Sequence, residues 1–177
     1  NEITNNLRDK MKYNLTLLSQ IHNNIYPIID DINICNINTL YLLKKKINKK
    51  VDLIIADYLY FCTDISESET VNYNLLLSQI IIGFNLLKHN GTFILKINST
   101  FSKEIKKLIQ LLNYFYNTVF LYKPTLSRSF NNEKYVICIN YKGMDKNIMQ
   151  LYLKLYEQMC NISLSNKQLL NTLTKQI

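Results

Sequence analysis

Short apolar segments alternate with helical segments in the middle of this chain. The apolar segments are residues 51–57, 92–97 and 118–122, and residues 72–88 and 102–115 between them carry apolar side chains at helical spacing. The first apolar run does not alternate with polar residues, which is typical of a parallel strand buried on both faces. Parallel neighbours need crossover connections, and these are right-handed as a rule. The order therefore predicts an α/β fold whose first three strands are parallel.

A fourth strand is predicted at residues 134–140, after a polar loop that follows Pro124. No helix precedes this strand, so we expect it to be antiparallel to a neighbour. Asn90-Gly91 is expected to end the helix at residues 72–88 as a C-cap. Residues 24–38 look irregular, and the remaining helices are expected at residues 5–23, 39–43, 145–160 and 165–175.

Composition excludes several classes of site. The 177 residues fit one domain or part of a larger one, and 47% of them are hydrophobic, which is enough for a core. The three glycines are too scattered for a G-x-G-x-x-G or Walker A loop. The two histidines lack an H-E-x-x-H context and the four cysteines form no C-x-x-C, so we expect no metal site and a reducing compartment. The longest apolar run is too short to span a bilayer, and no membrane partner is expected.

The net charge of +8 is weak support for nucleic acid binding. Asn, Ile, Lys and Tyr are abundant, a skew typical of an AT-rich genome, which would itself supply lysine codons. Five lysines lie within residues 44–50, directly after the predicted helix at residues 39–43. Cations at a helix C-terminus are favoured by the macrodipole, and an RNA-binding patch is the alternative interpretation.

Three ionisable residues are expected to converge at one edge of the sheet. Asp57 ends the first strand, Lys96 is near the end of the second, and Glu133 comes just before the fourth. Ligands of open α/β sheets bind beyond the carboxyl ends of the parallel strands, and an antiparallel strand begins at that same edge. A lysine in an apolar strand must be paired or lie at the rim. The plainer alternatives are a turn cap for Asp57, a structural ion pair for Lys96 and a solvated loop position for Glu133.

These segments resemble FtsJ-type ribose 2′-O-methyltransferases, above all the branch that methylates the first nucleotides of capped mRNA. Asp52–Asp57 matches D-L-[IV]-x-x-D, residues 72–79 are close to N-x-x-L-x-x-x-Q, and residues 90–96 match G-G-x-F-[IV]-[LV]-K. The most specific match is Lys123–Tyr135 with K-P-x-x-S-R-x-x-N-S-E-x-Y. The order and spacing of the four motifs agree, and the resemblance covers roughly residues 28–141.

The resemblance implies part of a Rossmann-like S-adenosylmethionine-dependent methyltransferase fold. Its parallel sheet would end in an antiparallel strand pair, followed by C-terminal helices. We expect a methyltransferase domain over residues 1–144 and a helical extension over residues 145–177. The family uses a Lys-Asp-Lys-Glu tetrad, and the resemblance assigns its Asp, second Lys and Glu to Asp57, Lys96 and Glu133 as catalytic residues.

The resemblance also implies a cofactor and partners. The cofactor would be S-adenosylmethionine, with Asp31 and Asp57 at its site, although the glycine of the family's G-D-I element is absent before Asp31. Ser127 and Arg128 could contact RNA phosphate, or simply hold their loop. Capped mRNA is the expected partner, with other capping enzymes as candidate further partners. The expected location is intracellular, in the cytoplasm or in a virion or viral factory, since the composition and cap-type motifs point to a large DNA virus or a similar AT-rich element.

Two family features have no counterpart. No glycine precedes Gly83, where the family has a glycine-rich cofactor loop, and nothing near Lys10 or Lys12 matches its first catalytic lysine. We therefore expect the chain to be the C-terminal, catalytic half of a cap ribose 2′-O-methyltransferase. The alternatives are a degenerate, non-catalytic methyltransferase-like subunit that supports an RNA-processing partner, and a ribosomal RNA 2′-O-methyltransferase.

Overall fold

The structure is a computed structural model, and it describes residues 25–28, 33–59, 65–98, 100, 102–125, 127 and 132–161. The chain divides into two compact units, Asn1–Asn33 and Ile34–Ile177. In the first unit the described residues form neither helix nor strand. The second unit contains every element described below. The helices expected at residues 5–23 and 165–175 lie outside the described residues.

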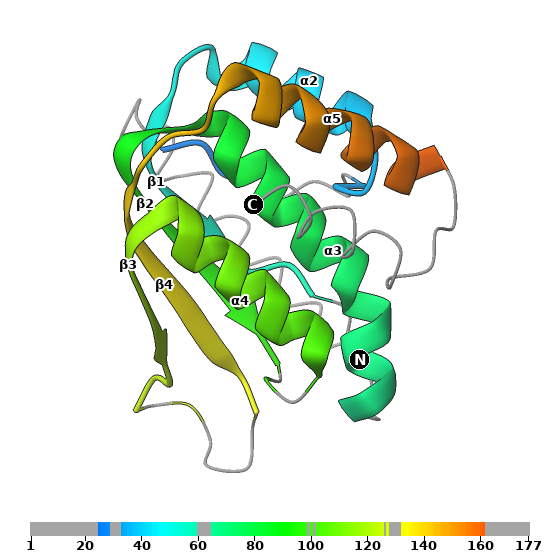
Figure 1. The fold of residues 1–177 in the computed structure, drawn as a ribbon, viewed down its shortest axis with the longest axis vertical. Coiled ribbons are helices and arrows are strands. Elements are labelled where there is room, and N and C mark those ends of the chain that lie inside the picture. The colour runs from blue at the N-terminus through cyan, green and yellow to red at the C-terminus, as the bar shows by residue number, and fades with distance from the viewer. Residues whose placement is uncertain are drawn as a thin grey trace. The chain divides into compact units, whose positions relative to one another are not determined.

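A four-stranded mixed sheet forms the centre of the second unit (Figure 1). β1 pairs in parallel with β2, and β4 pairs antiparallel with both β2 and β3. β3 therefore runs in the same direction as β1 and β2, so the predicted strand directions are confirmed. The sheet order is β1-β2-β4-β3, with β4 between the second and third strands of the chain. The strands are β1 (Val51–Ala56), β2 (Leu87–Ile97), β3 (Tyr116–Tyr122) and β4 (Lys134–Tyr141).

Helices connect and cover the strands. α3 and α4 lie on one face of the sheet, and α5 packs against α3 and α2 (Figure 1). Local capping sets two of the helix ends: the Ser102 side chain accepts a hydrogen bond from the Ile105 N–H at 3.1 Å where α4 begins, and Asn48 ends α2 with a φ of 53°. The helices are α2 (Ile37–Ile47), α3 (Ile65–Leu86), α4 (Lys103–Phe115) and α5 (Lys146–Asn161).

The core lies between these helices and one face of the sheet. Alternate residues of β2, namely Phe93, Leu95 and Ile97, are almost fully buried. Phe84 of α3 lies among other rings, with its ring centroid 4.9 Å from that of Phe115 and 5.7 Å from that of Tyr141. Close packing of this kind leaves little freedom for the strands to shift, so the strand ends are held at fixed relative positions.

The prediction that the first strand is buried on both faces is wrong. Leu53 and Ile55 of β1 are 50% and 63% exposed. Side chains alternate along a strand, so these two residues share one face of β1, opposite Ile54 and Ala56. Among the described strands, β1 pairs only with β2. An unbroken apolar run therefore does not by itself show that both faces are covered.

The predicted limits of the second helix are also corrected. α3 begins at Ile65 and ends at Leu86, so Asn90-Gly91 is not its C-cap but lies inside β2. Asn90 has a φ of 64°, and the β1–β2 register shifts in this region. A Cβ on Gly91 would lie 2.7 Å from Leu87 Cγ and 2.9 Å from Lys88 O, so the local bend requires glycine.

Candidate active site

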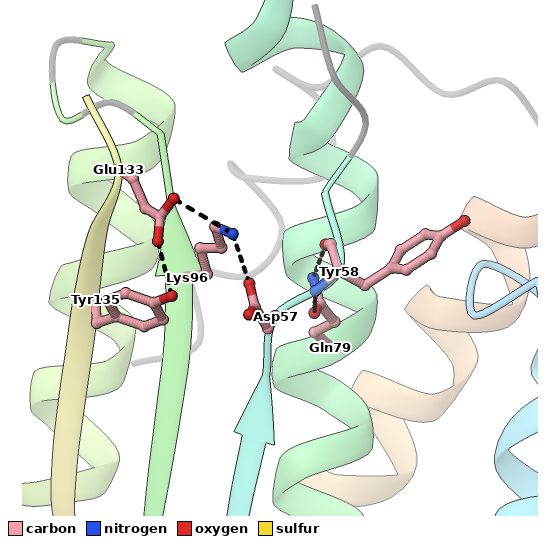
Figure 2. A network of polar contacts seen from close by, with 6 residues as sticks. All are labelled: Asp57, Tyr58, Gln79, Lys96, Glu133 and Tyr135. Atoms are coloured by element: carbon pink, nitrogen blue, oxygen red, sulfur yellow. Dashed lines mark hydrogen bonds and ion pairs between the residues drawn. The ribbon is translucent and has the colours of Figure 1, made fainter. Parts of the chain in front are cut away.

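Lys96 lies between two carboxylates at one edge of the sheet (Figure 2). Its Nζ is 2.8 Å from Asp57 Oδ1 and 3.5 Å from Glu133 Oε2. Asp57 directly follows β1, Lys96 is the penultimate residue of β2, and Glu133 directly precedes β4. The predicted convergence of these three residues is confirmed.

Strand pairing explains why the three side chains meet. In the parallel pair, Ala56 of β1 lies opposite Leu95 of β2. The residues that follow them, Asp57 and Lys96, are therefore also neighbours. In the antiparallel pair, Ile97 lies opposite Lys134, so β4 begins where β2 ends. Because β4 is inserted beside β2, Glu133 reaches the lysine from the other side.

The site is partly shielded from water. The side chains of Lys96 and Glu133 are each 23% exposed, and that of Asp57 is 49% exposed. Burial alone would lower the pKa of Lys96, but the hydrogen bond and charge of Asp57, together with those of Glu133, outweigh it. The pKa of Lys96 is therefore raised above its ordinary value, and the side chain is a cation at neutral pH.

Tyr135 is a further member of the site, although its place at the end of the Lys123–Tyr135 motif gave it no predicted role. Its hydroxyl donates to Glu133 Oε1 at 2.8 Å, while Oε2 of the same carboxylate faces Lys96 (Figure 2). Burial raises the pKa of Tyr135, and the hydrogen bond to Glu133 and the charges of Asp57 and Glu133 raise it further, so the phenol remains a donor. The E-x-Y spacing was the available signal, because residues two apart in extended chain share a face.

The other predicted site residues are placed only in part. Asp31 and Arg128 lie outside the described residues. The backbone N–H of Ser127 donates to Pro124 O at 3.0 Å, which closes a turn after β3. The Ser127 hydroxyl is buried and has no hydrogen-bond partner within the described part of the chain.

Three further features are the lysine cluster, the residue types that bind metals, and the length and apolar character of the helices. Lys44, Lys45 and Lys46 occupy the last turn of α2, which confirms the predicted helix-end position of the lysine cluster. Within the residues that the structure describes, no group of three or more His, Cys, Asp or Glu side chains could hold a metal ion. None of the described helices is both long and apolar enough to cross a membrane.

Comparisons with known proteins find a family and named relatives. The family model for FtsJ-like methyltransferase matches residues 9–141. The cap-specific mRNA (nucleoside-2′-O-)-methyltransferase 1 of Trypanosoma cruzi is 31% identical over 130 residues, which cover 72% of this chain and 35% of that protein. The cap-specific mRNA (nucleoside-2′-O-)-methyltransferase of Autographa californica nuclear polyhedrosis virus is 30% identical over 145 residues, covering 78% of this chain and 54% of that protein.

A solved structure is also similar. A ribosomal RNA methyltransferase from Plasmodium falciparum matches with a TM-score of 0.49 and 29% identity, over 65% of this chain and 60% of that chain. The present chain spans about a third of the Trypanosoma relative and about half of the viral one.

Proposed function

The chain belongs to the FtsJ-like methyltransferase family, and we propose that it carries the catalytic residues of an enzyme that methylates the ribose 2′-hydroxyl of capped mRNA. The observation that carries this proposal is the position of Lys96 between Asp57 and Glu133 at the carboxyl edge of the sheet. The names of the Trypanosoma and viral relatives support capped mRNA as the substrate class.

Lys96 is suited to activate a hydroxyl group. A ribose hydroxyl is a poor nucleophile until its proton is lost or polarised, and a cation beside its oxygen stabilises the negative charge that develops. The raised pKa of Lys96 favours this cationic role over that of a neutral base. The hydroxyl proton then passes to the half-exposed Asp57 or to water. Asp57 and Glu133 hold the ammonium group in place, and a fixed geometry is itself a large part of catalysis.

The proposed cofactor is S-adenosylmethionine, which supplies a methyl group on a positively charged sulfur. The described residues fit such a cation, because the Asp57 carboxylate is half exposed at the end of β1, beside the lysine. Asp57 would contact the cofactor there, and we propose Asp31 as a second contact. Asp57 and Asp31 would bind and orient the cofactor, and we propose no metal ligand.

RNA contacts are proposed for the loop before Glu133. Ser127 and Arg128 would contact backbone phosphate. Such contacts position a protein on a nucleic acid but do not recognise its sequence. The support for this role is the match of Lys123–Arg128 to the K-P-x-x-S-R motif of the family. We assign the methyltransferase domain to residues 1–144 and a helical extension to residues 145–177, of which α5 packs on α3.

The test is methyl transfer from labelled S-adenosylmethionine to capped RNA by the full native polypeptide, followed by mapping of the methyl group. Lys96→Ala should lower the rate by at least about 10²-fold, as loss of one charge-stabilising donor does in other enzymes. Lys88→Ala is the matched control, because Lys88 makes an ion pair with Asp52 between the same two strands. We expect it to leave the rate unchanged.

The other outcomes separate the alternatives. Full activity of Lys96→Ala would refute the assignment of the site. Equal methylation of uncapped RNA would favour a ribosomal RNA type of substrate. A folded wild-type protein that neither forms product nor binds S-adenosylmethionine in calorimetry would favour the non-catalytic subunit, which the absence of any glycine before Gly83 motivates.

A further inference from the structure

We infer that Gln79 is a positioning residue for Asp57, an inference that rests on the proposed function. Its side-chain amide makes two hydrogen bonds to the backbone of the residue that follows Asp57 (Figure 2). Nε2 donates to Tyr58 O at 2.9 Å, and Oε1 accepts from the Tyr58 N–H at 3.1 Å. One side chain therefore satisfies both polar backbone groups of Tyr58, in the way that a neighbouring strand would.

The Gln79 amide is itself held firmly. The residue is 6% exposed, and its second N–H donates to Leu75 O, one turn earlier in α3, at 3.2 Å. A buried amide is costly unless it is hydrogen bonded, and here both N–H groups and the oxygen have partners. The side chain therefore has little freedom to move, and it can fix the chain after β1 relative to α3.

The bonds to Tyr58 fall where the sheet stops holding the chain. β1 ends at Ala56, so the backbone of Asp57 is fixed by strand pairing on its N-terminal side only. Gln79 fixes it on the C-terminal side. The Asp57 side chain is half exposed, so packing alone does not orient it. The Tyr58 ring points away from Lys96 (Figure 2). Tyr58 therefore acts on the site through its backbone.

The same helix also contacts the strand that carries Lys96. Gly83 is one turn after Gln79, and a Cβ at Gly83 would lie 2.9 Å from Phe93 Cε2 in β2. α3 therefore contacts β2 through Gly83 and the chain after β1 through Gln79. The distance between Asp57 and Lys96 depends on both contacts.

The test compares two buried amides of α3 in the full native polypeptide. Gln79→Met keeps the length of the side chain and removes its bonds to Tyr58. Asn85→Leu is the matched control, because Asn85 is 4% exposed and, among the residues that the structure describes, its amide donates only to Ile81 O in its own helix, at 3.0 Å. We expect Gln79→Met to lower kcat roughly tenfold or more with little change in the KM for capped RNA, since misplaced catalytic groups act on the chemical step. Asn85→Leu should leave kcat unchanged.

Gln79→Glu adds a readout that a merely structural role would not produce. A protonated carboxyl introduced at position 79 can donate to Tyr58 O and accept from the Tyr58 N–H, whereas the ionised form can only accept. Burial raises the pKa of such a carboxyl, so the ratio of variant to wild-type kcat should rise as the pH falls. This variant also serves if Gln79→Met does not fold. A ratio near one at every pH would overturn the inference.

Hydrogen exchange of the Tyr58 amide tests the positioning without any activity. Exchange should become faster in Gln79→Met and stay unchanged in Asn85→Leu. Unchanged Tyr58 exchange in Gln79→Met, or unchanged kcat, would overturn the role of Gln79. Absence of product from the folded wild type would instead refute the proposed function, and the exchange measurement would still decide whether Gln79 holds the chain after Asp57.

Discussion

Lys96 and Tyr135 lie directly opposite each other across the antiparallel strands β2 and β4, and this register decides which acid reaches the lysine. Glu133 is two residues before Tyr135 and therefore extends toward the same side of the chain. Its Oε1 accepts a hydrogen bond from the Tyr135 hydroxyl, and its Oε2 faces Lys96 Nζ. A slip of one residue would turn every side chain of β4 to the other face, so the site depends on the sheet and not on the loop alone.

The first prediction concerns the Tyr135 hydroxyl. Tyr135→Phe removes the donor to Glu133 Oε1 and leaves that carboxylate freer to turn away from Lys96. Methyl transfer should fall about tenfold, since a hydrogen bond to a charged group contributes about 1.5 kcal/mol or more. Steady-state kinetics on capped RNA would measure this. Tyr122→Phe is the control, because Tyr122 is paired opposite Tyr135 on the other side of β4 and is exposed. Equal rates for the two variants would contradict the role of Tyr135.

The second prediction concerns the ionisation of Lys96. Its pKa is raised in the folded protein, against the effect of burial, by Asp57 and Glu133. NMR titration of labelled lysine side chains should therefore give Lys96 a midpoint above the ordinary value of 10.5. Asp57→Asn should lower that midpoint, because it removes the strongest of the groups that raise the pKa. A wild-type midpoint below the ordinary value would contradict the cationic role.

The same shift fixes the sign of a stability effect. Because the folded-state pKa is raised, the stabilisation from the ion pairs is fully present below the unfolded-state pKa, which is the ordinary value of 10.5. It is lost as the pH rises through the higher folded-state value. The difference in urea midpoint between wild type and Lys96→Met should thus be constant near neutral pH and shrink only at strongly alkaline pH. A difference that shrinks between pH 6 and 9, roughly, would contradict this.

Much of the fold could be predicted because the signals are local. Apolar runs and helical spacing located the strands, and the rules for connections gave their directions, so the meeting of Asp57, Lys96 and Glu133 was predictable. The insertion of β4 between β2 and β3 was not predictable, because a strand antiparallel to β3 could lie on either side of β3. The exposure of Leu53 was missed for a similar reason, since an apolar run is compatible with one or two covered faces.

Other misses come from residues whose role depends on a distant partner. An Asn-Gly pair suits both a helix C-cap and a bend within a strand, because both use a left-handed residue, and Asn90 proved to be in β2. Gln79 had only its place in a motif as a signal. Its hydrogen bonds to Tyr58, which is 21 residues earlier in the chain, are seen only in the structure.

The third prediction concerns the packing of α3 on β2. Gly→Ala inside a helix usually stabilises a protein by about 0.5–1 kcal/mol. Gly83→Ala should do the opposite, because its Cβ would lie 2.9 Å from the ring of the fully buried Phe93. Overpacking of this kind costs about 1–3 kcal/mol, which urea denaturation would detect. Gln110→Ala, at an exposed position of α4, is the control and should be nearly neutral. A stabilised Gly83→Ala would mean that the helix and strand can separate there.

The fourth prediction ranks the two carboxylates. Asp57 Oδ1 is 2.8 Å from Lys96 Nζ, within hydrogen-bond distance, and Glu133 Oε2 is 3.5 Å away. Asp57→Asn should therefore reduce methyl transfer more than Glu133→Gln, because the closer carboxylate holds the ammonium more strongly. Asp52→Asn is the matched control, since it removes the carboxylate that pairs with Lys88 between the same two strands. Single-turnover rates on capped RNA would establish the order. A larger loss for Glu133→Gln would show that Glu133, on the side of β4, dominates the orientation of Lys96 in the working enzyme.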